Sequence, residues 1–382
     1  MSTDKKNSGG IYIHIPFCKQ ACHYCDFHFS TSLKHKDRMI AAICTELALR
    51  KVEMKVPVQT IYFGGGTPSL LTSEEITTII KTVSSNFNVL PNPEITLEAN
   101  PDDLSEAVLK ALAASPINRL SIGVQSFFEK DLKLMNRAHN AYEAKISIQL
   151  AKQYFTNISI DLIYGIPQMS TKRWLSNVNK ALALDIPHFS CYALTVEPKT
   201  ALENFIKKGI IPPVEDDVAQ EHHAALIEKM EAAGYDNYEF SNFSKPGWES
   251  QNNMAYWQGR PYLGVGPSGH SYDGETRSWN VANNSKYLKS IEKNELPLER
   301  EQLSVIDKYN EYVMTRLRTK NGVLLSEIRE NFGEKYEQYV RTQADQYIQS
   351  GHVELSEDKL RVTKKGKFLS DGIASGLFLV NW

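Results

Sequence analysis

The chain has 382 residues, of which 42% are hydrophobic and 23% charged, and its formal net charge is −2. This balance is typical of a soluble protein of two or three domains, and the lack of a basic excess argues against a dedicated nucleic-acid binder. The polar start MSTDKKNSGG lacks the apolar core of a signal peptide, and no apolar run is long enough to span a membrane. We expect a cytoplasmic protein with reduced thiols, and peripheral association with a membrane stays compatible with the sequence.

The first half of the chain predicts alternating strands and helices. After a polar tail over residues 1–10, short β-branched runs alternate with longer helical patterns through residues 11–200. These runs are IYIHIPF, VQTIYFGGG, EITLEAN, INRLSIGV, ISIDLIYG and HFSCYAL. Strands that alternate with helices predict a parallel sheet of right-handed βαβ units, which is an α/β fold. Six such strands fit either an open doubly wound sheet or a partial barrel, and in both the functional residues should gather at the carboxyl ends of the strands.

The alternation ends after Glu197-Pro198. Residues 201–300 predict a long helix closed by Gly234, followed by a Gly- and aromatic-rich extension that packs on the core. Residues 301–382 predict short helices and then a hairpin around GHVELSEDKLRVT, which together suggest a small winged-helix-like domain. Domains of this kind either bind DNA or serve as packing modules, and the neutral charge balance favours packing.

Three of the five cysteines, Cys18, Cys22 and Cys25, lie within eight residues behind the first predicted strand. A zinc site would need a fourth ligand from a nearby histidine, and Cys22 with Cys25 has the spacing of a redox thiol pair. A [4Fe–4S] cluster held by three thiolates would leave one iron open to another ligand. The number three favours the cluster and leaves zinc as the alternative. We expect Cys44 and Cys191 to be buried bystanders.

The C-x3-C-x2-C spacing followed by an aromatic residue resembles the cluster loop of radical S-adenosylmethionine (SAM) enzymes. Six motifs extend the likeness in order: YIHIPFC, GGGTPS, EANP, GVQSF, NRAH and IDLIYGIP. Together they are similar to the branch that contains the oxygen-independent coproporphyrinogen III dehydrogenases and the HemW heme chaperones. The resemblance implies a radical-SAM partial (β/α)6 barrel over residues 11–200, which holds a [4Fe–4S] cluster and SAM and directs the radical chemistry of that cofactor.

Carried over position by position, the resemblance implies a set of SAM-binding residues. These are Tyr12, Tyr24, Gly65, Gly66, Thr67, Glu98, Gln125, Arg137 and Asp161, with Ala193 lining the pocket. Carboxylates can bind ribose hydroxyls or an ammonium group, and an arginine can pair with a carboxylate. The alternative for each charged residue is a helix cap or a solvated charge. We expect Gly65→Val to crowd SAM without unfolding the domain.

Two places in the sequence separate the dehydrogenases from the chaperones. The dehydrogenase loop resembles C-x3-C-x2-C-x-C, and Phe27 stands where its fourth cysteine would be, as in the chaperones. The chaperone motif H-N-x-x-Y-W corresponds to residues 252–257, where Asn252 replaces the histidine. Because an amide is not a usual ligand of heme iron, this stretch is either a heme-handling motif or a structural corner. His270 and Cys191 are other candidate axial ligands.

Three functions stay open at this point. The favoured one is a chaperone that binds heme, delivers it to a hemoprotein and is served by a reductant such as flavodoxin or ferredoxin. The second is oxidative decarboxylation of coproporphyrinogen III, which Phe27 argues against. The third is a non-catalytic metal or cluster module whose C-terminal domain recruits a partner.

Overall fold

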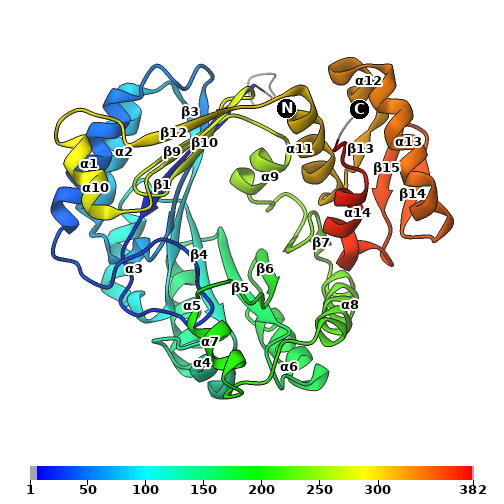
Figure 1. Ribbon diagram of the computed structural model, residues 1–382. Coiled ribbons are helices and arrows are strands. Elements are labelled where there is room, and N and C mark those ends of the chain that lie inside the picture. Colours follow the sequence, from blue (N-terminus) through cyan, green and yellow to red (C-terminus); the bar gives the residue numbers. More distant parts are fainter. Residues whose placement is uncertain (1–6, 381–382) are drawn as a thin grey trace.

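The computed structural model describes residues 7–380 (Figure 1). Its first half is a run of parallel strands, β1 (Gly9–Ile15), β2 (Val58–Gly65), β3 (Val89–Ala99), β4 (Arg119–Gln125), β5 (Ile158–Tyr164) and β6 (His188–Ala193). The helices between them are α1 (Lys36–Leu49), α2 (Ser73–Asn86), α3 (Glu106–Ala113), α4 (Glu129–Leu134), α5 (Ala141–Tyr154) and α6 (Thr171–Leu182). All six strands pair in parallel and in chain order, which confirms the predicted α/β class.

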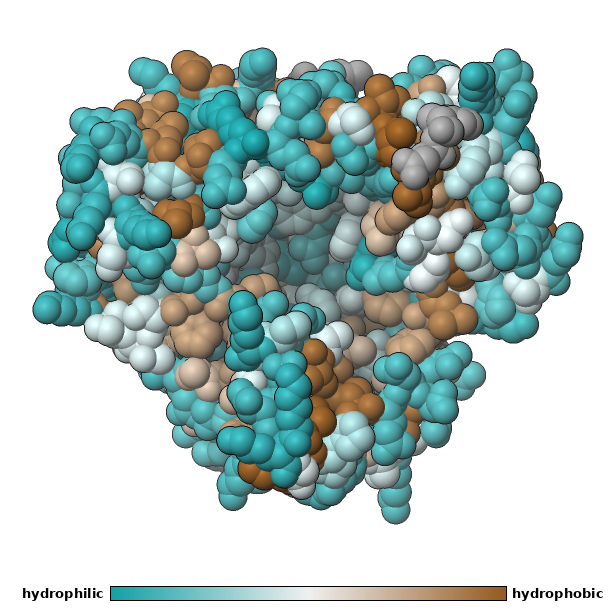
Figure 2. Space-filling model, in the orientation of Figure 1, coloured by the Kyte–Doolittle hydropathy of each residue, from teal (hydrophilic) through white to brown (hydrophobic). Residues whose placement is uncertain are grey.

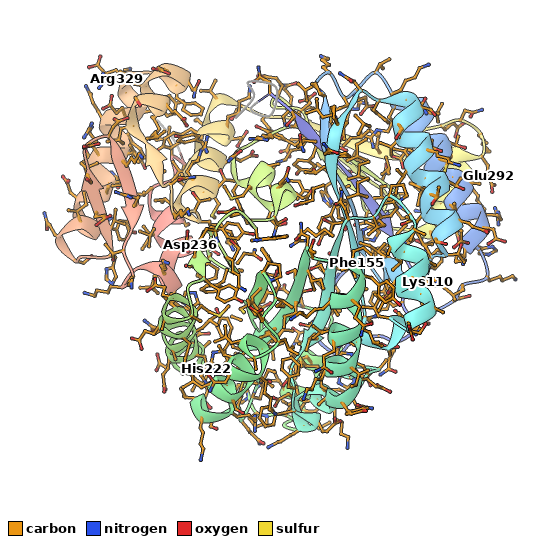
Figure 3. The ribbon with its side chains drawn as sticks, turned by 180° about the vertical axis from the view of Figure 1, so that it is seen from behind. Lys110, Phe155, His222, Asp236, Glu292 and Arg329 are labelled. Carbon is orange, nitrogen blue, oxygen red and sulfur yellow. The ribbon has the colours of Figure 1, made fainter. Side chains whose placement is uncertain are left out.

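Alternation of side chains along these strands gives the curved sheet two different faces. Ile11 and Ile61 are fully buried in the apolar core, whereas their neighbours Tyr12 and Tyr62 point to the opposite face. Helices cover the apolar, outer face, as the view from behind shows (Figure 3). The inner face is therefore left for polar side chains. Within residues 7–380, no helix is both long and apolar enough to cross a membrane.

Residues 201–300 extend the sheet at both of its edges. Their elements are α7 (Ala201–Lys207), α8 (Asp216–Ala232), β7 (Asp236–Asn237), β8 (Asn242–Ser244), α9 (Gln251–Trp257), β9 (Tyr262–Val265), β10 (His270–Tyr272), β11 (Thr276–Asn280), α10 (Asn284–Ile291) and β12 (Leu298–Gln302). β8 pairs antiparallel with β6, and β9 pairs in parallel with β1. In the described residues the sheet order is β12-β11-β10-β9-β1-β2-β3-β4-β5-β6-β8-β7, so β12 and β7 are edges and the barrel stays open.

The C-terminal part has a core of its own. It comprises α11 (Val305–Leu317), β13 (Val323–Leu324), α12 (Leu325–Phe332), α13 (Glu334–Gln349), β14 (Val353–Ser356), β15 (Lys359–Val362) and α14 (Ser370–Gly376). The strands form a small antiparallel sheet in the order β13-β15-β14. Val313, Ile328, Val340 and Leu360 are buried in this second apolar cluster. Helices followed by a hairpin match the winged-helix-like expectation, and the unit faces the open side of the barrel (Figure 1).

The N-terminal boundary differs slightly from the predicted one. Residues 1–6 of the predicted tail lie outside the described residues. β1 already begins at Gly9, whose N–H donates to the Pro57 carbonyl at 2.9 Å, and Ser8 before it is buried. The tail therefore ends before residue 10, because pairing with β2 draws the two glycines into the sheet.

Candidate functional site

The predicted SAM-binding residues line the inside of the barrel. Each of the six parallel strands contributes one, namely Tyr12 (β1), Gly65 (β2), Glu98 (β3), Gln125 (β4), Asp161 (β5) and Ala193 (β6). Gly66 and Thr67 follow β2, Arg137 lies between α4 and α5, and Tyr24 lies in the loop after β1. Parallel strands in chain order thus bring residues that are far apart in sequence to one end of the sheet.

The cysteine loop is held at both its base and its tip. The Cys18 N–H donates to the Ser30 carbonyl at 3.1 Å and closes the base. At the tip, the His23 N–H donates to the Met135 carbonyl at 3.1 Å, and the Leu202 N–H donates to the His23 carbonyl at 2.8 Å. The loop is therefore fixed against α4 and α7 rather than free in solvent.

The three cysteines of this loop are half-buried free thiols. Burial raises the pKa of the Cys25 thiol to about 11, and it raises the pKa of Cys18 against a hydrogen bond from Thr67 that favours the thiolate. Metal binding must therefore displace protons. Within residues 7–380, no three His, Cys, Asp or Glu side chains converge on a single metal ion. The thiolates of a cube-shaped cluster ligate three separate irons and need not converge.

Arg137 links the cysteine loop to the strand ends. Its Nη1 lies 3.4 Å from the Cys22 Sγ, and its Nη2 donates to the Asn100 Oδ1 at 2.6 Å and to the Gly123 carbonyl at 2.7 Å. Asn100 in turn donates to the Thr67 Oγ1 at 3.2 Å. The Arg137 Nε is buried and has no hydrogen-bond partner among the described residues. A half-buried cation at this place favours thiolates or the carboxylate of a ligand.

Two carboxyl groups stand on the inner face with raised pKa values. The Tyr62 hydroxyl donates to the Glu98 Oε1 at 2.8 Å, and the Ser121 hydroxyl donates to the Asp161 Oδ1 at 3.3 Å. Burial raises the pKa of Glu98 to about 7 and that of Asp161 to about 6, although these hydrogen bonds favour the ionised forms. Both groups can accept hydrogen bonds from hydroxyl or ammonium groups of a ligand.

The Gly-rich turn after β2 packs against the start of the cysteine loop. The Thr67 N–H donates to the Phe17 carbonyl at 2.6 Å, and a Cβ on Gly66 would lie 2.5 Å from that carbonyl oxygen. Gly65 has a φ of +103°, which favours glycine. A Cβ on Gly65 would lie 2.6 Å from the His14 ring. The expectation that Gly65→Val leaves the domain intact is therefore wrong, because valine would strain the backbone and displace His14.

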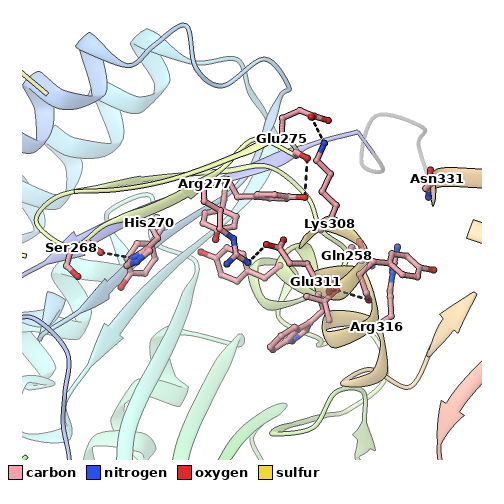
Figure 4. A pocket seen from close by; sticks show the side chains of 18 of the residues that line it. Gln258, Ser268, His270, Glu275, Arg277, Lys308, Glu311, Arg316 and Asn331 are labelled. Atoms are coloured by element: carbon pink, nitrogen blue, oxygen red, sulfur yellow. Dashed lines mark hydrogen bonds and ion pairs between the residues drawn. The ribbon is translucent and has the colours of Figure 1, made fainter. Parts of the chain in front are cut away.

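A cavity of about 1010 Å³ lies between the barrel and the C-terminal part, where the space-filling view is hollowed (Figures 2 and 4). Its walls come from residues 26–28 of the cysteine loop, from α9 and β9–β11, and from α11 and α12. The aromatic lining includes Tyr256, Trp257, Tyr262 and Tyr272. Phe27, which is 65% exposed, lines the cavity on the side of the cysteine loop. The cavity is large enough for a flat aromatic ligand.

The stretch at residues 252–257 has two ends with different roles. Asn252 is buried, its Oδ1 accepts a hydrogen bond of 3.1 Å from the Thr60 hydroxyl, and its N–H donates to the Glu94 Oε1 at 3.0 Å. Tyr256 and Trp257 line the cavity, and Asn252 does not. The amino-terminal end of the stretch is thus a structural corner, whereas its aromatic end faces the cavity.

The remaining cysteines and histidines are placed differently with respect to the cavity. Cys191 is 1% exposed in the apolar core and does not line the cavity, and Cys44 is half-buried in α1. His270 is exposed and lines the cavity. Of the two candidate axial ligands outside α9, only His270 is accessible to a bound porphyrin.

The side chains that support the predicted site residues were not among those predicted from the sequence. Tyr62 bonds Glu98, Ser121 bonds Asp161, and Asn100 connects Arg137 with Thr67. The alternation of apolar and polar residues in RLSIGVQ and ISIDLIY was a usable signal, because it marks the inner face of each strand.

Comparison with known proteins agrees with this geometry. The Radical SAM superfamily profile matches residues 12–176, and the HemN C-terminal domain profile matches residues 303–369. Heme chaperone HemW of Bacillus subtilis is 34% identical over 375 residues, which cover 96% of this chain and 98% of that protein. HemW of Escherichia coli is 32% identical over 389 residues, with 97% of each chain covered. Coproporphyrinogen III oxidase HemN of Escherichia coli has a similar fold, with a TM-score of 0.84 at 24% identity over 99% of this chain and 92% of that one.

The fold and the strand-end site define a radical SAM protein, a class that carries a [4Fe–4S] cluster and SAM. The identity to the named relatives extends over nearly the full chain. The chain therefore belongs to the HemW heme chaperone family.

Proposed function

We propose that this protein binds heme and delivers it to hemoproteins. The observation that carries the proposal is the cavity of about 1010 Å³ beside the cysteine loop, which is lined by aromatic side chains. Its relatives in Bacillus subtilis and Escherichia coli are named heme chaperones. Tyr256 and Trp257 would stabilise a porphyrin by contact with its large flat faces.

Cys18, Cys22 and Cys25 are the proposed ligands of the [4Fe–4S] cluster. Three half-buried thiols without disulfide partners are a suitable donor set, and the neighbouring guanidinium of Arg137 offsets the negative charge of thiolates. When bound, the cluster supplies an electron for the cleavage of SAM.

The inner face of the barrel is the proposed SAM site. Glu98 and Asp161 would accept hydrogen bonds from ribose hydroxyls or from the ammonium group, and Arg137 would orient the carboxylate. The tight turn at Gly65 and Gly66 would allow the backbone to approach the ligand closely, since any side chain there meets neighbouring atoms.

The proposal includes partners and a location. A flavodoxin or a ferredoxin would reduce the cluster, and a hemoprotein would receive the heme. The cytoplasm is the proposed compartment, because reduced thiols persist there and are needed to bind iron.

Heme titration and heme transfer test the function together. After anaerobic reconstitution with iron and sulfide, the protein should give a Soret band with hemin and pass the heme to an apo-hemoprotein. Trp257→Ala should weaken hemin binding, while Tyr142→Ala, at a side chain 72% exposed outside the cavity, should leave it unchanged. A protein that binds no hemin would contradict the proposal. Conversion of coproporphyrinogen III would favour the dehydrogenase alternative instead.

A further inference from the structure

The β10–β11 ribbon presents three side chains to the cavity from one face. In the antiparallel ladder Tyr272 stands opposite Arg277, and His270 stands opposite Trp279. Side chains two residues apart on a strand share a face with their cross-strand partners. His270, Tyr272 and Arg277 accordingly all line the cavity. Figure 4 labels His270 and Arg277 in its wall.

His270 is oriented as a metal-binding histidine would be. Its Nδ1 lies 2.9 Å from the Ser268 carbonyl oxygen, which favours the tautomer with the proton on Nδ1 and an unprotonated Nε2. Its ring stacks on Trp279, with centroids 6.3 Å apart and planes at 28°. Within residues 7–380, no hydrogen bond occupies the His270 Nε2. The lone pair on this nitrogen is therefore available to an iron atom.

The other two histidines of the cavity wall differ in this respect. The Nε2 of His14 is 2.9 Å from the His28 carbonyl oxygen, and the Nε2 of His28 is 2.7 Å from the Asn284 Oδ1. His14 is also buried. Ligation of iron through Nε2 would cost either residue a hydrogen bond, and it would cost His270 none.

Arg277 is a matching anchor for a carboxylate. Its Nη2 lies 2.7 Å from the Glu311 Oε1 on α11, and the two side chains are 47% and 23% exposed. An ion pair this exposed contributes little to stability, so another carboxylate can replace Glu311 at small cost. The ladder offsets Arg277 from His270 by two residues, or about 7 Å along the ribbon. That offset is comparable with the span from the iron of heme to a propionate at the porphyrin edge.

We infer that the β10–β11 ribbon is the heme-holding element, with the His270 Nε2 as iron ligand and Arg277 as propionate anchor in place of Glu311. Tyr272, between them on the same face, contacts the porphyrin ring. The inference rests on the proposed function, because it requires heme in the cavity.

Three porphyrins separate the two roles: hemin, its dimethyl ester and iron-free protoporphyrin IX. His270→Ala should alter the Soret band and weaken hemin binding about tenfold, while affinity for the iron-free porphyrin stays unchanged. Arg277→Gln should weaken hemin binding about tenfold and leave binding of the ester unchanged. Glu311→Gln should strengthen hemin binding, a gain that misfolding cannot produce.

Matched controls lie outside the cavity. His352→Ala removes a histidine that bonds Ser350, and Arg329→Gln breaks the ion pair with Glu337 on the far side of the C-terminal part (Figure 3). Both should bind hemin as the wild type does. A wild-type Soret band in His270→Ala would refute the iron ligand. Equal losses for hemin and ester in Arg277→Gln would refute the anchor. If the wild type binds none of the porphyrins, the proposed function itself fails.

Discussion

Tyr62 holds Glu98 from the neighbouring strand: its phenolic hydroxyl donates a hydrogen bond of 2.8 Å to the Glu98 Oε1, on the inner face of the barrel. The ring of Tyr62 stacks in turn on Tyr12, with centroids 6.1 Å apart and planes at 20°. This hydrogen bond fixes the position of the Glu98 carboxyl group. Burial of the group raises its pKa to about 7. Its protonation state changes near neutral pH.

Glu98 should make the stability of the protein depend on pH. Because its pKa rises from 4.5 to about 7 on folding, the stability it contributes is fully present below about pH 4.5 and is lost as pH rises through 7. Urea unfolding at pH 5 and pH 8 should show a larger fall in the free energy of unfolding for the wild type than for Glu98→Gln. Parallel pH profiles would mean that Glu98 is ionised already in acid.

Removing the three clustered thiols should remove the cluster. The Cys18→Ala, Cys22→Ala, Cys25→Ala triple variant should lose the brown chromophore and its bound iron after anaerobic reconstitution. Cys44→Ala, which changes a half-buried thiol in α1, should keep both. Unchanged iron content in the triple variant would contradict the assignment of these cysteines as cluster ligands.

Arg137 should tune the cluster. Its guanidinium is 3.4 Å from the Cys22 Sγ, and a nearby positive charge stabilises the reduced, more negative cluster. Arg137→Gln should therefore lower the reduction potential by on the order of tens of millivolts. A redox titration followed by electron paramagnetic resonance measures this. A potential that rises or stays constant would contradict the role.

The protein should not turn over coproporphyrinogen III. Phe27 occupies the position at which the dehydrogenase-type pattern C-x3-C-x2-C-x-C has its fourth cysteine. It is 65% exposed on the cavity wall, and its side chain has no group that transfers a proton. The reduced protein with SAM should give no multiple-turnover product by chromatography. Sustained formation of protoporphyrinogen IX would overturn this expectation.

Asn252→His should affect stability and not heme. The buried Asn252 accepts a hydrogen bond from Thr60, and a larger ring there should lower the free energy of unfolding by about 1–3 kcal/mol. The Soret band with hemin should match that of the wild type, because position 252 does not line the cavity. A new Soret band at unchanged stability would restore residue 252 as an iron ligand.

The parallel strands could be predicted from the sequence, and the cavity could not. Runs such as ISIDLIYG, separated by amphipathic helices, carry their pattern locally. β8 and β10 are three residues long each, and their strand conformation depends on pairing with distant partners. The cavity is lined by Phe27, Tyr256 and Glu311, which are far apart in the sequence and share no hydrophobic periodicity.

The site residues also include some whose place could be predicted from the sequence and some whose contacts could not. The cysteines and the Gly-rich turn follow strands and carry distinctive spacing, so their place at the strand ends was predictable. The strain that Gly65→Val would cause was not, because it comes from a ring on the neighbouring strand at His14. The role of residue 252 also depended on a contact across the sheet, with Thr60.

The parallel pairing of β1 with β9 has a consequence for the order of assembly. β1 pairs with β9 from Gly10↔Tyr262 to Ile13↔Val265. Because β9 is synthesised about 250 residues after β1, this pairing can form only late in synthesis. Strands β2 to β6 emerge earlier and need nothing beyond β1 to form their ladder. On the ribosome, the cysteines therefore meet the strand ends while the side later covered by β9–β12 and α11 is still open to solvent. The part of the chain that supplies β9–β12 and α11 is thus added last, beside strand ends that already carry the cysteine loop.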